Sequence, residues 1–298
     1  MSSPVAKKQK KILENPFVGS LMVPIAIVLV GALIIFGITK MLSTERSYKD
    51  LVNEIQSKTF GNKWVAAYEL SKQINSSQIP KEDYPWLIQN LSQAYKDSVE
   101  PRSRGFIIAA VGALKSNLAI PLFETSLEDP DLDVKFHTIV SIANMPKGIS
   151  FDWKKLISQL NSPEMILRQA SVLALATHKV VLAEEKMAEL LTDESNLVRY
   201  SSAIGLINFK NQKAILVLKE LLLKSYPELN EKINPPHLDA KQINDLKLSA
   251  LETLKTENWG ELNDAILEVT KRDAHNSVVL KAKEVLNSLK NENSVRII

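Results

Sequence analysis

The sequence predicts an all-α protein, a right-handed α-solenoid of about seven helix pairs preceded by one transmembrane helix. Three observations support this prediction. A loop-to-helix pattern recurs every 31 to 33 residues in its clearest copies, and such a period is typical of helical repeats. Nine glycines and an aromatic share of 6% are low for a sheet-rich fold with many tight turns. One uncharged stretch near the N-terminus is long enough to cross a bilayer.

The uncharged stretch covers residues 17–38, FVGSLMVPIAIVLVGALIIFGI, and contains 22 residues. A helix of this length spans roughly 33 Å, which is about the thickness of the bilayer hydrocarbon. A cleaved signal peptide is the main alternative, but its apolar core is only about 7–15 residues long and a small-x-small cleavage site follows it. Here Thr39-Lys40-Met41-Leu42 follows, so we interpret residues 17–42 as an uncleaved signal anchor that contacts the lipid bilayer through residues 17–38.

Basic residues flank this stretch on both sides. KKQKK at 7–11 precedes it, whereas Lys40, Arg46 and Lys49 follow it. The excess of positive charge on the N-terminal side favours a cytoplasmic N-terminus. The sequence therefore predicts a single-pass protein of the inner (cytoplasmic) membrane. Residues 1–16 would form a cytoplasmic basic tail, and the solenoid would lie outside the cytoplasm, in the periplasm of a bacterium.

The body of the chain is almost neutral. The first 43 residues hold five of the 37 basic residues and one of the 34 acidic residues, which leaves 32 basic and 33 acidic residues for the rest. Nucleic-acid binding needs basic residues concentrated on one face, so we expect no nucleic-acid partner. The absence of cysteine excludes disulfides, thiolate metal sites and thiol nucleophiles.

The repeat is clearest in three stretches that superpose without gaps. They are EDPDLDVKFHTIVSIA at 128–143, NSPEMILRQASVLALA at 161–176 and TDESNLVRYSSAIGLI at 192–207. Weaker copies align at Asn62-Lys63, Leu246-Lys247 and Val278, and a degenerate copy runs through Phe106. About seven units therefore fill residues 44–290.

Each copy combines a helix breaker with an amphipathic helix. Asp, Ser or Pro ends one helix and caps the next. An apolar residue, a small residue four positions later and an apolar residue eight positions later then form one buried stripe. In the two clearest copies the stripe residues are Leu167, Ser171, Leu175 and Val198, Ser202, Leu206. Another amphipathic helix is expected ahead of each turn, at 83–96, 153–160, 181–191, 214–223 and 262–270.

These residues resemble HEAT repeats, in particular the short bacterial HEAT-like kind whose second helix begins D-x-x-x-V-R-x-x-A-x-x-A-L. The resemblance covers about 245 residues, and it is weakest around Phe106, where Ile107 fills the basic position. It implies a curved stack of helix pairs whose second helices line a concave face. It also implies a scaffold without enzymatic activity.

Five basic residues share one position of the pattern. They are Lys63, Lys135, Arg168, Arg199 and Lys247. One interpretation is a basic ladder that binds an anionic partner. The other is ion pairing with acids of adjacent turns, such as Asp131, Asp133, Glu164 and Asp193, and the resemblance favours this second interpretation. Exposed pairs of this kind stabilise a protein by about 0–1 kcal/mol each.

No catalytic, cofactor or metal site is expected. His137, His178, His237 and His275 fall in different units without a metal-ligand spacing. No glycine-rich phosphate loop and no Gly-x-Ser-x-Gly elbow occurs. The four tryptophans, Trp64, Trp86, Trp153 and Trp259, stand at helix starts and are interpreted as packing residues.

Two segments depart from the pattern. KSYPELNEKINPPHLDAKQIND at 224–245 lengthens one unit, and it is either a binding loop or a tolerated surface insertion. The polar stretch that begins at Asn291 predicts a flexible C-terminal tail over residues 291–298.

The sequence thus predicts a membrane-anchored scaffold, not an enzyme, that binds and positions a protein partner at the membrane. Transport or motility assemblies of the bacterial envelope are candidate partners. The expected partner-binding residues are Lys135, His137, Arg168, Arg199, Tyr200 and His237. The alternative is a HEAT-like enzyme, such as a lyase, or a small-ligand protein that uses the concave face.

Overall fold

The computed structural model describes residues 46–57, 63–76, 78–227 and 238–295. The chain divides into two compact units, residues 1–47 and residues 48–298. Regular structure in the described residues consists of fourteen α-helices and several short 3₁₀ segments, without any strand. This confirms the predicted all-α class.

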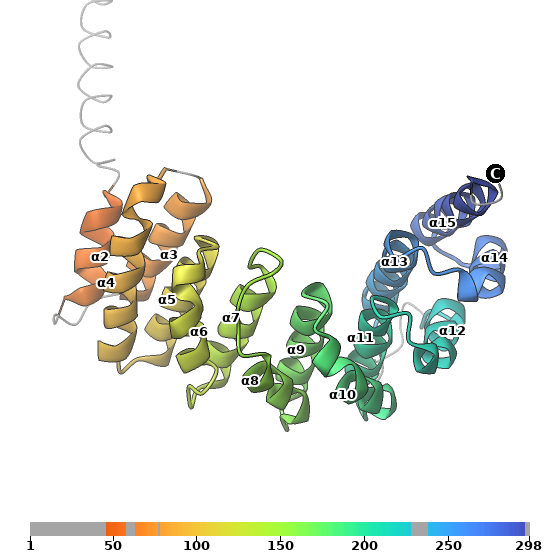
Figure 1. The fold of residues 1–298 in the computed structure, drawn as a ribbon, viewed down its shortest axis with the longest axis horizontal. Coiled ribbons are helices and arrows are strands. Elements are labelled where there is room, and N and C mark those ends of the chain that lie inside the picture. The colour runs from red at the N-terminus through yellow and green to blue at the C-terminus, as the bar shows by residue number, and fades with distance from the viewer. Residues whose placement is uncertain (1–45, 58–62, 77, 228–237, 296–298) are drawn as a thin grey trace, which may run out of the picture. The chain divides into compact units, whose positions relative to one another are not determined.

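The helices of residues 48–298 follow one another as seven pairs, numbered here as repeats 1 to 7, each with a first and a second helix (Figure 1). The pairs are α2 (Tyr48–Gln56) with α3 (Lys63–Asn75), α4 (Tyr84–Asp97) with α5 (Pro101–Ala113), α6 (Ile120–Ser126) with α7 (Leu132–Ala143), α8 (Trp153–Ser158) with α9 (Met165–Thr177), α10 (Glu184–Glu189) with α11 (Asn196–Ile207), α12 (Ile215–Leu223) with α13 (Ala240–Thr256), and α14 (Asn263–Arg272) with α15 (Asn276–Val295).

The second helices form one continuous layer. Each packs against the second helix of the next repeat, in the order α3, α5, α7, α9, α11, α13 and α15 (Figure 1). The first helices cover one side of this layer. We call the opposite side the outer face of the second-helix layer.

The buried stripe lies where the pattern predicts it. Leu175 and Leu206 are 0% exposed, and Ser171 and Ser202 between the apolar stripe positions are equally buried. Small residues allow this close packing. At Gly112 of α5, a Cβ atom would come within 2.3 Å of Ser141 Oγ, so a larger residue there would push α5 and α7 apart.

Several helices are capped by side chains at their N-terminal ends and by residues in the left-handed conformation at their C-terminal ends, although few of these residues are glycine. Asp131 caps α7 by accepting hydrogen bonds from the backbone N–H of Asp133 and Val134. Four second helices, α3, α9, α11 and α13, end in the same hydrogen bond, for example Val180 N–H to the Leu175 carbonyl, which closes a Schellman motif. The residue before it, Lys179, has φ of 50° and takes the position usually held by glycine.

The register in repeat 2 differs from the sequence-based alignment. Ser103, Ile107 and Val111 form the buried stripe of α5, so the basic position is filled by Arg104. The assignment of Ile107 to that position was wrong by three residues. The first stripe position of α5 holds a polar serine, and this hid the pattern in the sequence.

The predicted localisation is corrected by the structure. Among the residues that it describes, no helix is long and apolar enough to cross a membrane. The basic tail at 1–16 and the stretch at 17–42, on which the inner-membrane prediction rested, lie outside the described residues.

The two irregular segments are described in part. Residues 228–237 of the predicted insertion lie outside the described residues, and its last residues, from Ala240, belong to α13. At the C-terminus, α15 continues to Val295 and so extends into the predicted tail.

Replacing a stripe leucine should destabilise the fold strongly. We expect Leu175→Ala or Leu206→Ala to lower the free energy of unfolding by about 2–5 kcal/mol, because each leaves a cavity between repeats. Leu173→Ala on the same helix is the matched control, because that side chain is 48% exposed and should change stability by only about 0.5 kcal/mol. Urea unfolding of the three variants measures this, and equal effects at positions 173 and 175 would contradict the register.

Candidate functional site

A buried ion pair joins repeat 4 to repeat 5. Arg168 of α9 donates from Nε and Nη2 to the two carboxylate oxygens of Asp193, at 2.8 and 2.9 Å. Its Nη1 donates to the carbonyls of Ser162 and Pro163, at 2.9 and 3.0 Å, in the turn before its own helix. Asp193 also accepts a hydrogen bond from the backbone N–H of Ser195. One guanidinium thus fastens two turns of neighbouring repeats, and we call this arrangement a clamp.

Two more junctions carry a clamp at the equivalent place. Arg104 of α5 pairs with Asp129 of repeat 3 at 2.8 and 2.9 Å, and Asp129 also accepts a hydrogen bond from the Tyr95 hydroxyl at 2.6 Å. Lys247 of α13 pairs with Asp273 of repeat 7 at 2.7 Å. The side chains of these pairs are at most 12% exposed. Pairing therefore accounts for Arg168 and Lys247 of the predicted ladder, and Arg104 is a member that sequence reasoning missed.

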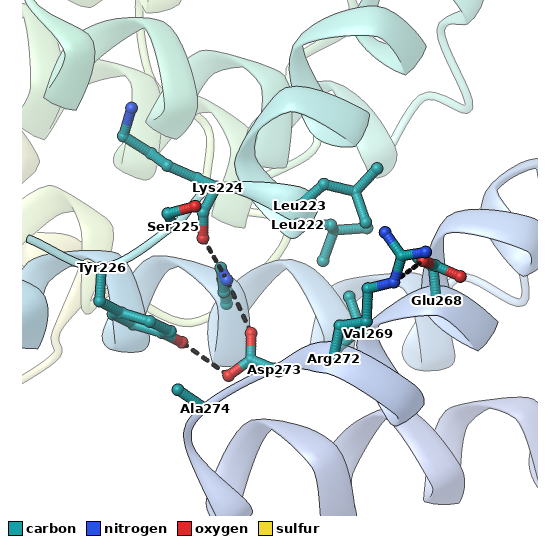
Figure 2. A pocket seen from close by; sticks show the side chains of 11 residues that line it. Leu222, Leu223, Lys224, Ser225, Tyr226, Glu268, Val269, Arg272, Asp273 and Ala274 are labelled. Atoms are coloured by element: carbon teal, nitrogen blue, oxygen red, sulfur yellow. Dashed lines mark hydrogen bonds and ion pairs between the residues drawn. The ribbon is translucent and has the colours of Figure 1, made fainter.

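The third clamp borders a cavity of about 570 Å³ (Figure 2). Lys247 Nζ donates to Asp273 and to the Lys224 carbonyl, and it lies 4.4 Å from the centroid of the Tyr226 ring. Burial lowers the pKa of Lys247, although the hydrogen bond to Asp273 opposes this effect. Figure 2 shows Tyr226 directed at Asp273, with which its hydroxyl forms a hydrogen bond, and Arg272 directed away from them, toward Glu268. These contacts engage the Lys247 ammonium group, as the guanidinium groups of Arg104 and Arg168 are engaged in the other two clamps.

The sequence-predicted binding residues do not form one site. Arg168 is buried in its clamp. Tyr200 is 0% exposed and donates its hydroxyl to Glu220, to which Arg199 Nη2 also donates at 2.6 Å. Arg199 Nε is buried without a hydrogen-bond partner. His237 lies outside the described residues.

Lys135 and His137, both half-buried on α7, remain near the surface. In the part of the chain that is described, the Lys135 ammonium group has neither an ion-pair partner nor a hydrogen-bond partner. His137 belongs to a set of aromatic side chains on the outer face of repeats 1 to 3.

This aromatic set runs across three second helices. Trp64 and Tyr68 of α3 pack on Phe106 of α5, with ring centroids 5.8 and 6.0 Å apart, and Phe106 lies 6.3 Å from His137 of α7. The guanidinium carbon of Arg102 lies 3.7 Å from the centroid of the Trp64 ring. Tyr68 is 43% exposed, so the set is open to solvent.

Beside these rings lies a cleft of about 460 Å³, which we call the aromatic cleft. Its lining residues are Glu100, Pro101, Arg102, Gly105, Phe106, Asp131, Asp133 and His137. Gly105 keeps it open, because a Cβ there would come within 3.1 Å of the His137 ring. Burial lowers the pKa of His137, so the ring is neutral near pH 7. Three carboxylates therefore face one guanidinium, and the cleft is negative.

A second concavity, of about 350 Å³, lies on the same outer face between α9, α11 and α13. Its apolar walls include Leu173, Leu197 and Ile204, and amide and hydroxyl side chains such as Gln169 and Ser249 form its rim. We call it the apolar groove.

Sequence reasoning missed the aromatic cleft because it interpreted Trp64 as a packing residue and misplaced α5 by three positions. With the corrected register, Phe106 and His137 hold equivalent positions of their helices, each one residue before a buried stripe residue, Ile107 and Thr138 respectively. In the described residues, no group of three or more His, Cys, Asp or Glu side chains could hold a metal ion.

Comparisons with known proteins agree with the repeat. Residues 153–231 match the family model of HEAT repeats. The structure of YibA from Escherichia coli aligns with a TM-score of 0.55 and 15% identity, over 83% of each chain. The complex of CpcE and CpcF of phycocyanin lyase from Nostoc sp. PCC7120 aligns with a TM-score of 0.52 and 16% identity, over 82% of this chain and 94% of that chain. Comparison with curated proteins gave no match. The fold is thus a HEAT-like α-solenoid.

Breaking one clamp should be more damaging than removing an exposed charge beside it. We expect Asp193→Asn to destabilise the protein by about 3–5 kcal/mol, because it leaves the buried Arg168 guanidinium without its countercharge. Glu194→Gln is the control, since its side chain is 90% exposed and lies 3.8 Å from Arg168. The double variant Arg168→Met/Asp193→Asn should be more stable than Asp193→Asn alone. Strict additivity in thermal unfolding would argue against a coupled pair.

The clamp at Asp129 should make stability depend on pH below about 4. Burial alone would raise the pKa of Asp129, but hydrogen bonds from Arg104, Tyr95 and the Asp131 backbone outweigh it, so the pKa is lowered. Since the unfolded carboxyl titrates at about 3.9, the stabilisation is present above that pH and is lost as pH falls through the folded-state pKa. Asp129→Asn should show a flatter stability curve between pH 5 and about 2 than Glu128→Gln, an exposed control. Parallel curves would contradict this.

Proposed function

We propose that this protein is a non-enzymatic HEAT-like scaffold that binds a protein partner at the aromatic cleft of repeats 1 to 3. The observation that supports this most is the run of Trp64, Tyr68, Phe106 and His137, with Arg102, along three second helices. Trp, Tyr and Arg are the residues that most often dominate binding energy at protein interfaces.

The cleft is held ready for a partner. Its two walls, Phe106 and His137, stand on α5 and α7, and the clamp between Arg104 and Asp129 fastens these two repeats. A site that is already in its bound arrangement loses less conformational entropy on binding. Rigid support of this kind favours a binding surface over a loosely packed aromatic patch.

The charge of the cleft indicates what the partner presents. Glu100, Asp131 and Asp133 face it, whereas Arg102 is its one formal cation near pH 7. Arg102 already shows how a guanidinium stacks on an aromatic ring of this surface, at 3.7 Å from the centroid of Trp64. We infer that the partner inserts an arginine or lysine side chain beside Phe106 and Asp133.

An enzyme or small-ligand protein on the same scaffold is the alternative. One observation favours it, namely the cavity of about 570 Å³ beside Lys247, a volume that suits a small ligand. Phycocyanin lyase subunits have a similar fold, but at 16% identity this similarity concerns the fold alone. We prefer the scaffold because the Lys247 ammonium group is engaged by Asp273 and a backbone carbonyl, which leaves it no role in chemistry.

Site-specific photocrosslinking in the source cells tests the proposal. Photoreactive residues at positions 68 and 137 should capture one protein, whereas the exposed first-helix positions Glu185 and Leu216 should not. With the captured protein purified, Phe106→Ala should weaken binding about tenfold or more, which corresponds to about 1.4 kcal/mol or more. Asp133→Asn should weaken it less and reduce its salt dependence. Crosslinks from positions 185 and 216 alone would place the binding surface on the first helices instead.

A further inference from the structure

The clamps occur at alternate junctions of the solenoid. They join repeat 2 to 3, repeat 4 to 5 and repeat 6 to 7. Between repeats 1 and 2, the buried stripe of α3 is Ala66, Leu70 and Ile74, so the basic position is filled by Ala67 and not, as the sequence predicted, by Lys63. No clamp can form there. Between repeats 5 and 6, Arg199 pairs instead with Glu220 on α12, the first helix of repeat 6, and these two side chains are 24% and 48% exposed. The buried clamps therefore group repeats 2 to 7 into three pairs, and the contact between repeats 5 and 6 is a more exposed ion pair.

Between repeats 3 and 4, half of the clamp is present. Lys135 occupies the basic position of α7, but Ser162 stands where the aspartate would be, three residues before α9. Ser162 Oγ accepts a hydrogen bond from the Glu164 backbone N–H at 3.2 Å. Asp129 and Asp193 make the same contact two residues ahead, at 2.9 and 2.8 Å. The turn at Ser162 therefore has the same hydrogen bond as the turns of the clamped junctions, and it lacks only the carboxylate.

Other contacts hold this junction at the opposite end of its helices. His178 Nε2 hydrogen bonds to the Ile142 carbonyl at 2.8 Å, and the Trp153 ring packs on His178 with centroids 5.0 Å apart. Ile142 and His178 lie at the C-terminal ends of α7 and α9, and Trp153 is the first residue of α8. A partly buried polar contact thus joins the C-terminal ends of α7 and α9. Near the end that carries Lys135, the two repeats are joined by apolar packing and by one exposed ion pair, Lys155 with Glu128 at 2.9 Å, which contributes little to stability.

We propose that the junction of repeats 3 and 4 is a hinge, at which the N-terminal ends of α7 and α9 separate while the His178 contact acts as the pivot. The clamped pairs on either side, repeats 2–3 and repeats 4–5, move as rigid blocks. The aromatic cleft lies on one side of the hinge and the apolar groove lies on the other. Opening changes the distance between these two surfaces, whichever partner binds them.

Completing the clamp should lock the hinge. Lys247 and Asp273 show that lysine can form this pair, at 2.7 Å. We expect Ser162→Asp to slow amide hydrogen exchange in α7 and α9 by about tenfold, the effect of one charge-assisted hydrogen bond. Exchange in α3 and α14 should stay unchanged. The matched control Ser162→Asn keeps the turn without the charge and should not slow exchange, and Lys135→Met in the Ser162→Asp background should remove the gain.

The reverse change tests the same idea at a clamped junction. Asp193→Ser converts the junction of repeats 4 and 5 to the arrangement found at Ser162, and exchange at the N-terminal half of α11 should then accelerate to the rate found in wild-type α9. In the wild-type protein, α7 and α9 should open more often across their shared junction than α9 and α11 across theirs. Equal exchange in Ser162→Asp and Ser162→Asn, or uniform exchange across all junctions of the wild type, would overturn the hinge.

Discussion

The clamp places two full charges where little water reaches them, and the stacking of the repeats depends on its being complete. A buried pair stabilises only if every donor and acceptor is used, because the loss of hydration is large. Arginine suits this demand, since its planar fork reaches both carboxylate oxygens and still leaves a nitrogen for two carbonyls, as Arg168 shows. The apolar stripes of the repeats are so alike that they cannot distinguish a correct neighbour from a shifted one. A displaced repeat would leave a charge unpaired, so the clamps select the register that the stripes leave open.

The same interaction connects stability to the proposed function. Phe106 and His137 lie on different repeats, and the distance between them is only as constant as the junction that separates α5 from α7. The Asp129 carboxylate fixes that junction, because it accepts two hydrogen bonds from Arg104 and one from the Tyr95 hydroxyl. A repeat protein without such a bond could present the same aromatic residues, but their separation would fluctuate and the entropy lost on binding would be larger.

Burial explains what could be predicted from the sequence. Leu175, Leu206 and the small residues between stripe positions are buried, and buried residues of a helix recur with the helical period. This spacing can be recognised within one repeat. Arg104 was missed because in the clear repeats an apolar residue directly precedes the basic residue, whereas here Ser103 takes that place. The sequence could not decide whether the basic residues bind an anionic partner or form ion pairs within the protein. That depends on which acidic residue lies beside each basic residue in the fold, and its position is set by the conformation of two turns and the helix between them. The aromatic cleft needed the corrected register, since Trp64 and Phe106 have no distinguishing feature in sequence.

The clamp also constrains the number of residues between its two partners. Its two partners are 25 residues apart in repeats 2–3 and 4–5 and 26 residues apart in repeats 6–7. At the junction of repeats 3 and 4 the interval from Lys135 to Ser162 is 27 residues, and the long segment before α13 follows Arg199, where no clamp is described. The clamped intervals therefore differ by one residue at most, whereas the longer intervals are those that no clamp closes. In this protein, tolerance to insertion and deletion is a property of each interval, and the absence of a clamp marks where the chain is free to change length.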